Sequence, residues 1–280
     1  MAAAAAAAAR PRPTARPETS HVDDADTSSG VGVVRNRLRA PHEPLRTFHP
    51  RRSPLGPARQ RALDGMWPRL GFSVHDPARR PPLTASGQLD VAVLFGRPAP
   101  LVVEIGSGMG EAVVAMAAAD PARDYLAVEA HVPGVANLLV RLGDAGPDNV
   151  RVAHGDALDL LRLHVAPGAL DAVHVLFPDP WPKARHHKRR LIQPEPVALI
   201  ASRLRPGGLL HCATDWPEYA EHMLTVLTAD PHLQNTYPGY APRPADRPLT
   251  RFEQRGLDAG RPIADLVFRR RATPDEPTPS

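Results

Sequence analysis

Four carboxylates occur where short apolar segments of the sequence end, and they are Glu104, Glu129, Asp156 and Asp179. If the apolar segments are parallel strands, their carboxyl ends meet at one rim of a sheet, where open sheets bind ligands. We therefore expect these four side chains to line a single site. An acidic rim suits a ligand that carries positive charge and no phosphate. S-adenosylmethionine, with a sulfonium and an ammonium group, fits that description better than a dinucleotide does.

A glycine-rich loop follows the first of these apolar segments. Gly106, Gly108 and Gly110 come directly after residues 101–105 and precede a predicted helix. Glycine lets the backbone turn sharply and approach a ligand closely. Such a loop also occurs in nicotinamide enzymes, so an oxidoreductase is an alternative, which the acid Glu104 disfavours.

A stiff turn with an acid and an aromatic residue follows the fourth apolar segment. In residues 177–183 two prolines flank Asp179, and proline fixes the backbone around it. We expect a nucleobase to stack on Trp181 while Asp179 meets the edge of the base. The alternative is that Trp181 fills the core and the turn is only rigid.

A run of cations comes next in the sequence, at residues 183–190. Its members are Lys183, Arg185, His186, His187, Lys188, Arg189 and Arg190. A run of charge is ordinarily a solvated face. Because this run adjoins the expected acidic rim, we expect it to bind phosphates, with a salt slope of roughly −3 to −4 if it neutralises about four of them.

Two further polar segments are candidates for substrate contact. Asp215 follows the fifth apolar segment, where it either joins the rim or caps the next helix. Thr250 and Glu253 have the spacing of a capping box. The alternative is that Thr250, Arg251, Phe252 and Glu253 form a polar loop that reaches over the cleft and reads the base.

The elements that must position these residues alternate between strands and helices. We expect strands at 101–105, 125–128, 150–153, 172–176 and 209–213, and a late strand at 263–268 on a sheet edge. Helical spacing of apolar residues occurs at 111–119, 135–142, 194–204 and 219–227. This alternation predicts an α/β fold with a mostly parallel sheet and helices on both faces.

Composition narrows the class of protein. The chain has 280 residues, of which 42% are hydrophobic. Its one cysteine, Cys212, excludes an internal disulfide and a cysteine-rich zinc site, so we expect no metal and a cytoplasmic location. No apolar run approaches about 18 residues, so we expect no membrane span. We expect a disordered Ala/Pro/Arg-rich arm at 1–45, one domain at 46–271 and a flexible tail at 272–280.

Taken together, these segments resemble the bacterial tRNA (guanine-N7-)-methyltransferase family. The resemblance is carried by residues 103–110, 128–131, 177–190, 213–216 and 250–256. It extends from about residue 45 to 270, and the run from Phe177 to Arg190 is its most specific part. One departure is Ala130, where the family more often has valine.

The resemblance implies a class I methyltransferase (Rossmann-like) fold, with a mostly parallel seven-stranded sheet and a late antiparallel strand. It implies S-adenosylmethionine as the cofactor, in contact with the four rim acids, and a guanine of the tRNA variable loop as the target. Asp179 is then the catalytic position. Substrate contacts are implied for Lys183, Asp215 and residues 250–253, with residues 185–190 on RNA.

N7 of guanine has an unprotonated lone pair, so its methylation requires no general base. Catalysis then depends on positioning and electrostatics, and Asp179 is expected to stabilise the positive charge that develops on the purine. Two alternatives are a methyltransferase for an exocyclic nucleobase amine and an RNA-binding protein without catalysis. The sequence does not decide between a monomer and a homodimer.

Overall fold

The computed structural model describes residues 55–143 and 146–272 of the chain. The predicted arm at 1–45 lies outside this range, as does all of the predicted tail except residue 272. Within the described residues, no helix combines the length and the apolar character needed to cross a membrane.

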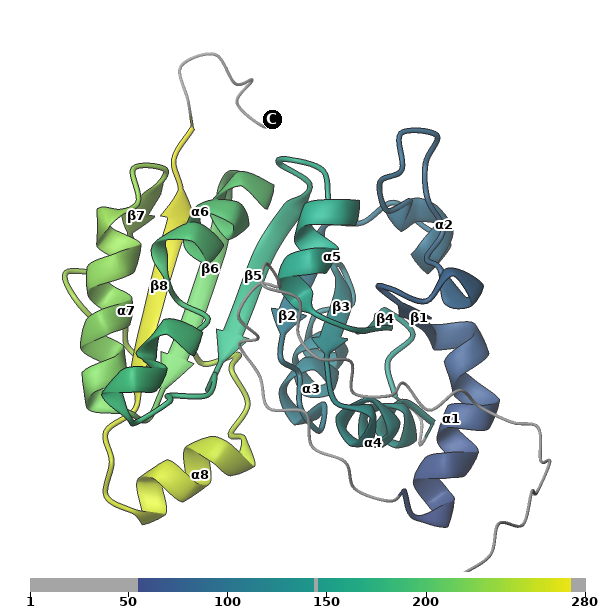
Figure 1. Cartoon of the computed structure of the whole chain (residues 1–280), viewed down its shortest axis with the longest axis horizontal. Coiled ribbons are helices and arrows are strands. Elements are labelled where there is room, and N and C mark those ends of the chain that lie inside the picture. Colours follow the sequence, from purple (N-terminus) through teal and green to yellow (C-terminus); the bar gives the residue numbers. More distant parts are fainter. Residues whose placement is uncertain (1–54, 144–145, 273–280) are drawn as a thin grey trace, which may run out of the picture. The chain divides into compact units, whose positions relative to one another are not determined.

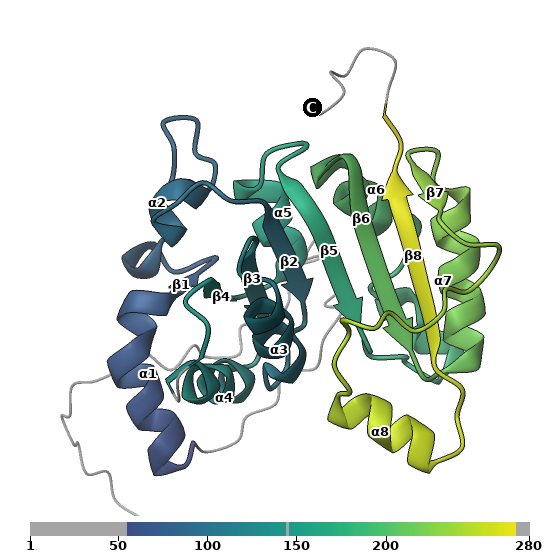
Figure 2. The same cartoon turned by 180° about the vertical axis from the view of Figure 1, so that it is seen from behind.

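The described strands form one sheet (Figures 1 and 2). They are β1 (Gly71–Ser73), β2 (Leu101–Ile105), β3 (Asp124–Glu129), β4 (Val150–His154), β5 (Leu170–Leu176), β6 (Leu204–Thr214), β7 (Leu233–Asn235) and β8 (Ala264–Arg270). Their order is β1-β4-β3-β2-β5-β6-β8-β7. All pairs are parallel except those that β8 makes with β6 and β7.

The sheet confirms the mostly parallel class and the late antiparallel strand, with two corrections. It has eight strands instead of seven, and β8 lies inside the sheet instead of at an edge, because β7 pairs with its outer side. The strands that we did not predict, β1 and β7, have three residues each. A segment that short does not establish a period of alternating side chains, so no sequence pattern identifies it.

The helices connect these strands. They are α1 (Pro57–Leu70), η1 (Pro77–Arg79), α2 (Val91–Phe95), α3 (Glu111–Ala119), α4 (Val132–Gly143), α5 (Ala157–His164), η2 (Ala184–Arg189), α6 (Pro194–Arg203), α7 (Pro217–Ala229) and α8 (Arg251–Asp258), where η denotes a 3₁₀ helix. Proline opens α1, α6 and α7, where its missing N–H leaves no bond unmade.

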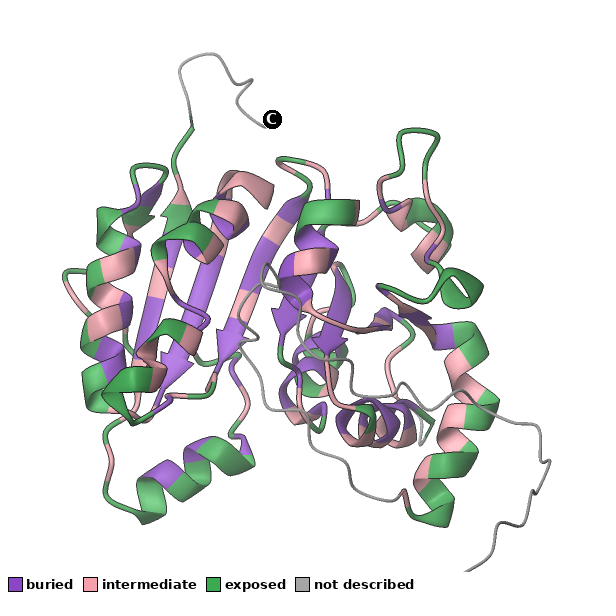
Figure 3. Ribbon diagram, in the orientation of Figure 1, coloured by how far each residue is buried: buried purple, intermediate pink, exposed green. Residues whose placement is uncertain are grey.

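Two apolar layers cover the sheet, one on each face. Leu101, Val103 and Ile105 of β2 pack with α5, α6 and α7, whereas Val102 packs with α1, α3 and α4. Because side chains alternate along a strand, Glu104 points to the same face as Val102. Every residue of β2 is buried (Figure 3), as is typical of a parallel strand covered on both faces.

Helix α8 lies beyond the carboxyl ends of β5 and β6 instead of against a face of the sheet (Figures 1 and 2). Of its residues only Glu253 and Gly256 are buried, so most of its surface is exposed (Figure 3).

Candidate functional site

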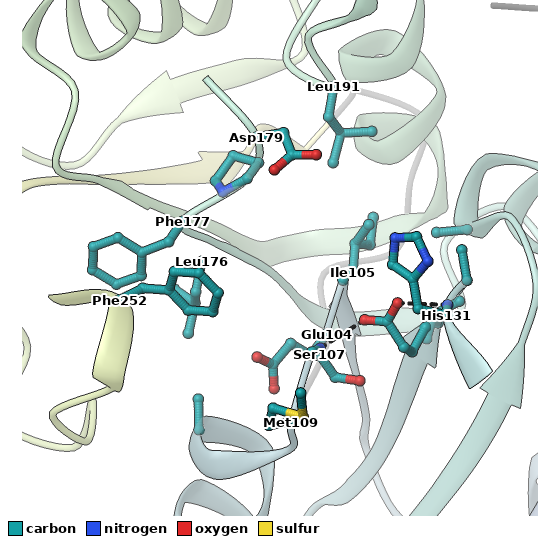
Figure 4. Close-up of a pocket in the computed structure, with 18 of the residues that line it drawn as sticks. Glu104, Ile105, Ser107, Met109, His131, Leu176, Phe177, Asp179, Leu191 and Phe252 are labelled. Atoms are coloured by element: carbon teal, nitrogen blue, oxygen red, sulfur yellow. Dashed lines mark hydrogen bonds between the residues drawn. The ribbon is translucent and has the colours of Figure 1, made fainter. Parts of the chain in front are cut away.

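A pocket of about 580 Å³ opens at the carboxyl ends of the parallel strands. It is formed by the glycine loop after β2, the end of β3, the start of α5, the turn after β5 and the start of α8. This volume lies within the range of small-molecule sites. In the close-up, Asp179 and Leu191 lie on one side, and Glu104, Ser107 and Met109 lie on the other (Figure 4).

The structure brings the four predicted rim acids, Glu104, Glu129, Asp156 and Asp179, together in the lining of this pocket. They come from four segments that are far apart in the sequence. The parallel pairing of β2 with β3 and β5, and of β3 with β4, aligns the ends of these strands.

Glu104 has the most unusual environment of the four acids. Its side chain is only 3% exposed, and its Oε2 atom has no hydrogen-bond partner. Burial, with a smaller contribution from the charge of Glu129, raises the pKa of Glu104 to about 8. The hydroxyl of Ser107, also in the pocket lining, is buried without a partner as well. Buried polar atoms are normally paired, so these two indicate a ligand.

The buried acid Glu129 and the half-buried acid Asp156 are partly satisfied by the backbone. The carboxylate of Glu129 accepts hydrogen bonds from the N–H groups of Gly108 and His131, both at 2.7 Å. Asp156 caps α5 and accepts from the N–H of Leu158 at 2.8 Å. Burial raises the pKa of both acids, although these hydrogen bonds oppose the shift.

The three glycines of the loop have different surroundings. Gly106 and Gly108 line the pocket, and a β carbon on Gly106 would meet no atom within 4 Å. Gly110 does not line it. Its φ is 78° at the start of α3, and a β carbon there would lie 2.4 Å from Cδ1 of Leu138. Gly110 is therefore required for the packing of α3 against α4, and the expectation that it contacts a cofactor finds no support in its position.

The turn after β5 is rigid, and its backbone is unusual. Phe177 and Trp181 have positive φ angles of 53° and 46°, which are uncommon for bulky residues and mark a constrained segment. The N–H of Phe177 donates to the carbonyl of Ala213 at 2.8 Å. Asp179, between the two aromatic residues, is exposed at the pocket.

Trp181 does not present the stacking surface that we expected. Its side chain is only 5% exposed, and Arg189 lies over the ring at 5.0 Å. The alternative interpretation, a tryptophan that fills the core, agrees with the structure. The phenylalanine residues that line the pocket are instead Phe177 and Phe252, both of which are drawn in Figure 4.

The cationic run does not line the pocket, and its members have different surroundings. Lys183, Arg185 and Lys188 are exposed, and His186, His187 and Arg189 are partly buried. All except Lys183 and Arg190 belong to η2.

Arg190 is the exception in this run, because it is only 1% exposed. Its guanidinium donates to both carboxylate oxygens of Glu218, at 3.0 and 2.5 Å, and to the carbonyl of Pro180 at 2.9 Å. It also lies 4.6 Å from the ring centre of Tyr219. The position of Arg190 therefore gives no support to the expected contact with RNA, because its donors are used inside the protein.

Asp215 also differs from its expected role. It does not cap α7, whose N-cap residue is Trp216, and it does not line the pocket. Its Oδ2 atom accepts two hydrogen bonds from Arg261, at 2.9 and 2.6 Å. A β carbon on Gly256 of α8 would lie 2.8 Å from that of Asp215, so Asp215 is a packing surface for α8.

The segment at 250–253 caps a helix and also reaches the pocket, whereas contact with a base stays a prediction. Thr250 caps α8 by accepting the N–H of Glu253 at 3.1 Å. At the same time Thr250, Arg251 and Phe252 line the pocket, and Phe252 is 55% exposed. Glu253 is 1% exposed and does not line the pocket, so it is not placed for direct contact with a base.

Several lining residues are absent from our sequence-based set. They include Ser107, Met109, Glu111, His131, Phe177, Leu191 and Arg255. Ser107 and Met109 belong to the glycine loop, and Phe177 begins the stiff turn, so their places in those segments could have indicated them. No local pattern indicates Glu111, whose carboxylate accepts a 2.5 Å hydrogen bond from Arg251 of α8. Among the described residues, no group of three or more His, Cys, Asp or Glu is placed to hold a metal ion.

Comparisons with known proteins identify the family of the chain. A family model described as a putative methyltransferase matches residues 98–266. A tRNA (guanine-N(7)-)-methyltransferase of Streptomyces avermitilis is 54% identical over 228 residues, which are 81% of this chain and 75% of that protein. Proteins of the same name from Nitrosospira multiformis and Aromatoleum aromaticum are each 50% identical, over 83% and 91% of this chain and 97% and 96% of their own length. Identity at this level over most of both chains means that the chain belongs to the bacterial tRNA (guanine-N7-)-methyltransferase family.

Proposed function

We propose that this protein transfers a methyl group from S-adenosylmethionine to N7 of a guanine in tRNA, in the variable loop. The observation that carries the proposal is the acidic pocket. It holds a buried carboxylate oxygen without a hydrogen-bond partner, it adjoins exposed cations, and it belongs to a chain that is 54% and 50% identical to two proteins named for this reaction.

The pocket fits S-adenosylmethionine by its polar atoms. The unpartnered Oε2 of Glu104 is a buried acceptor and would pair with the ammonium group. Glu129, which already accepts two backbone N–H groups, retains lone pairs for ribose hydroxyls. Asp156 lies at the start of α5 in the same lining and would accept from another donor. When bound, the cofactor supplies a methyl group on a positively charged sulfur.

Asp179 acts on the substrate in this proposal. It is an exposed carboxylate at the pocket, held by a turn that two prolines stiffen. N7 of guanine carries a free lone pair, so no proton has to be removed before it attacks. The reaction leaves positive charge on the purine, and a fixed carboxylate beside the ring stabilises that charge as it develops.

Phe177 and Phe252 are placed to hold the target base. Both line the pocket, and Phe252 is 55% exposed, so a ring surface is accessible. Stacking of a base on an aromatic side chain contributes about 1–3 kcal/mol, which offsets the few kcal/mol needed to unstack the base from the tRNA.

The tRNA backbone would contact the exposed cations on either side of the pocket. Lys183, Arg185 and Lys188 lie next to the turn that carries Asp179, and Arg251 and Arg255 line the pocket from α8. These cations fix the register of the tRNA without reading sequence.

The test is to incubate unmodified tRNA with S-adenosylmethionine that carries a labelled methyl group, to digest the tRNA into oligonucleotides, and to identify both the labelled fragment and its labelled nucleoside by mass spectrometry. We expect 7-methylguanosine at a single position in the variable loop. Label on an exocyclic amine, or binding of tRNA without any transfer of label, would contradict the proposal.

A further inference from the structure

The sheet face over β6 and β8 carries buried polar side chains. His211 of β6 and Asp265 of β8 are 8% and 2% exposed, and their side chains share a 2.7 Å hydrogen bond. Their strand neighbours Cys212 and Leu266 point to the other face and belong to the apolar core there. A buried polar cluster of this kind is stable only when its groups are paired. The carboxylate of Asp265 therefore needs a second partner besides His211.

That partner is Arg247, which is 1% exposed. Its Nη2 atom donates to Asp265 at 3.0 Å, and its two Nη atoms donate to both carboxylate oxygens of Glu253, at 2.7 and 2.9 Å. Its guanidinium carbon lies 5.6 Å from the ring centre of Phe177. One buried side chain therefore connects β8, the first turn of α8 and the start of the stiff turn after β5.

Each end of this connection reaches the pocket. Phe177 lines it directly. Glu253 does not, but its N–H is held by Thr250, which lines the pocket together with Arg251. Helix α8 has eight residues, too few for a stable isolated helix in water. Its position must therefore come from tertiary contacts, and Arg247 makes a fully buried one at its first turn.

Arg243 provides a comparison within the same cluster. It also donates to both oxygens of Glu253, at 2.7 and 3.2 Å, but its side chain is 41% exposed. No contact between Arg243 and Asp265 or Phe177 is present among the described side-chain hydrogen bonds and ring contacts. Because the arginine of this ion pair is partly exposed to solvent, we expect the pair to contribute less to the position of the helix than the fully buried pair that Arg247 makes.

We propose that Arg247 is a positioning residue for the substrate guanine: it sets the distance between the first turn of α8 and the turn that carries Asp179. The proposal rests on the function proposed above, because the guanine would lie between these two segments. Phe252 comes two residues after the capping residue Thr250, and Asp179 comes two residues after Phe177, so a shift of α8 would move one wall of the base site relative to the carboxylate. The glycine loop and the end of β3 form the side of the pocket proposed for the cofactor. Among the described residues there, none shares a hydrogen bond or an ion pair with Arg247.

The test compares Arg247→Lys with the matched control Arg243→Lys. Lysine keeps the charge but lacks the planar fork that holds two carboxylates at once. For Arg247→Lys we expect kcat for tRNA methylation to fall about 10- to 100-fold, the range associated with a misplacement of about 1 Å. We expect Arg243→Lys to stay within about twofold of the unmodified enzyme. The dissociation constant for S-adenosylmethionine, measured by calorimetry, should change less than about twofold in both variants.

A second measurement does not depend on turnover. Hydrogen exchange followed by mass spectrometry should show faster exchange in peptides that cover α8 for Arg247→Lys, and unchanged exchange for Arg243→Lys, because an α8 released from β8 frays. Peptides that cover α3 and β3 should exchange as in the unmodified protein. If the unmodified protein transfers no methyl group, the proposed function fails, while the exchange data still test whether Arg247 positions α8.

Three outcomes would overturn the proposal. Equal activity in the two lysine variants would show that Arg247 is no more important than its exposed neighbour. A parallel loss of cofactor binding and of turnover would show a general structural role. Exchange in α8 that is the same in both variants would show that other contacts hold this helix.

Discussion

Replacing Glu104 with glutamine should remove a link between cofactor binding and pH. The pKa of Glu104 is raised to about 8, mainly by burial, so at pH 7 about one tenth of the ligand-free molecules carry the ionised carboxylate. An ammonium group binds the ionised form. Binding at neutral pH must therefore release a proton from this carboxyl group in most molecules, and affinity should rise with pH until Glu104 is ionised before the ligand arrives.

The size of the effect follows from the pKa. For each pH unit below the pKa, ionising Glu104 before the ligand binds costs about 1.4 kcal/mol. The dissociation constant for S-adenosylmethionine should therefore fall about tenfold between pH 6 and pH 7 and level off near pH 8. At pH 7 about 0.9 proton should be released for each ligand bound. Glu129 and Asp156 face the same pocket and also have raised pKa values, so the Glu104→Gln variant is needed to isolate the contribution of Glu104.

The assay is calorimetric titration at pH 6, 6.5, 7 and 7.5 in two buffers with different ionisation enthalpies, which counts released protons directly. Glu104→Gln should bind more weakly at pH 7.5, with a dissociation constant that changes little with pH. An unmodified protein whose affinity is constant from pH 6 to 7.5 and that releases no proton would refute the reasoning.

The pH dependence of the free energy of unfolding provides an independent check on the raised pKa of Glu104. The pKa of Glu104 is about 8 in the folded protein, against an ordinary value of 4.5 for a glutamate side chain. Between these values the folded protein holds a proton that the unfolded chain has lost, so the free energy of unfolding should fall by about 1.4 kcal/mol per pH unit as the pH rises. Relative to Glu104→Gln, the ligand-free unmodified protein should therefore lose stability from pH 5.5 to 7.5 in thermal unfolding experiments.

Three further predictions concern the substrate side. Asp179→Asn should lower kcat by about 100-fold or more, the magnitude associated with loss of one electrostatic group, while calorimetry shows a nearly unchanged cofactor affinity; an equal loss of both would mean that Asp179 serves only to hold the cofactor. Replacing Lys183, Arg185 and Lys188 together with alanine should flatten the slope of log tRNA affinity against log salt by about 2–3 units, measured by filter binding, and an unchanged slope would show that these cations are merely solvated. Gly256→Ala should displace α8, because the new β carbon would lie 2.8 Å from that of the aspartate it packs on; a lower kcat with unchanged cofactor affinity is expected, and wild-type turnover would show that α8 tolerates the shift.

The acidic rim is the part of the site that the sequence by itself determined. Each acid ends or follows a run of apolar residues, and the carboxyl ends of parallel strands must lie at one edge of the sheet. Local pattern and general topology were therefore sufficient to bring Glu104, Glu129, Asp156 and Asp179 together. The same reasoning identified the glycine loop and the capping role of Thr250, because both depend on neighbours within a few residues.

Only the tertiary structure decided which charged residues of a polar segment are buried and which are exposed. Lys188 and Arg190 stand two residues apart in one cationic run, yet Lys188 is exposed and Arg190 is buried against Glu218 of α7. Glu253 appeared to be a residue that reads the base, but it is the partner of Arg247. Whether a charge faces solvent or a partner depends on which distant element packs over it. A local pattern describes the chain's own geometry and contains no information about that element, so only the folded arrangement separates the cations that can meet RNA from those that hold the protein together.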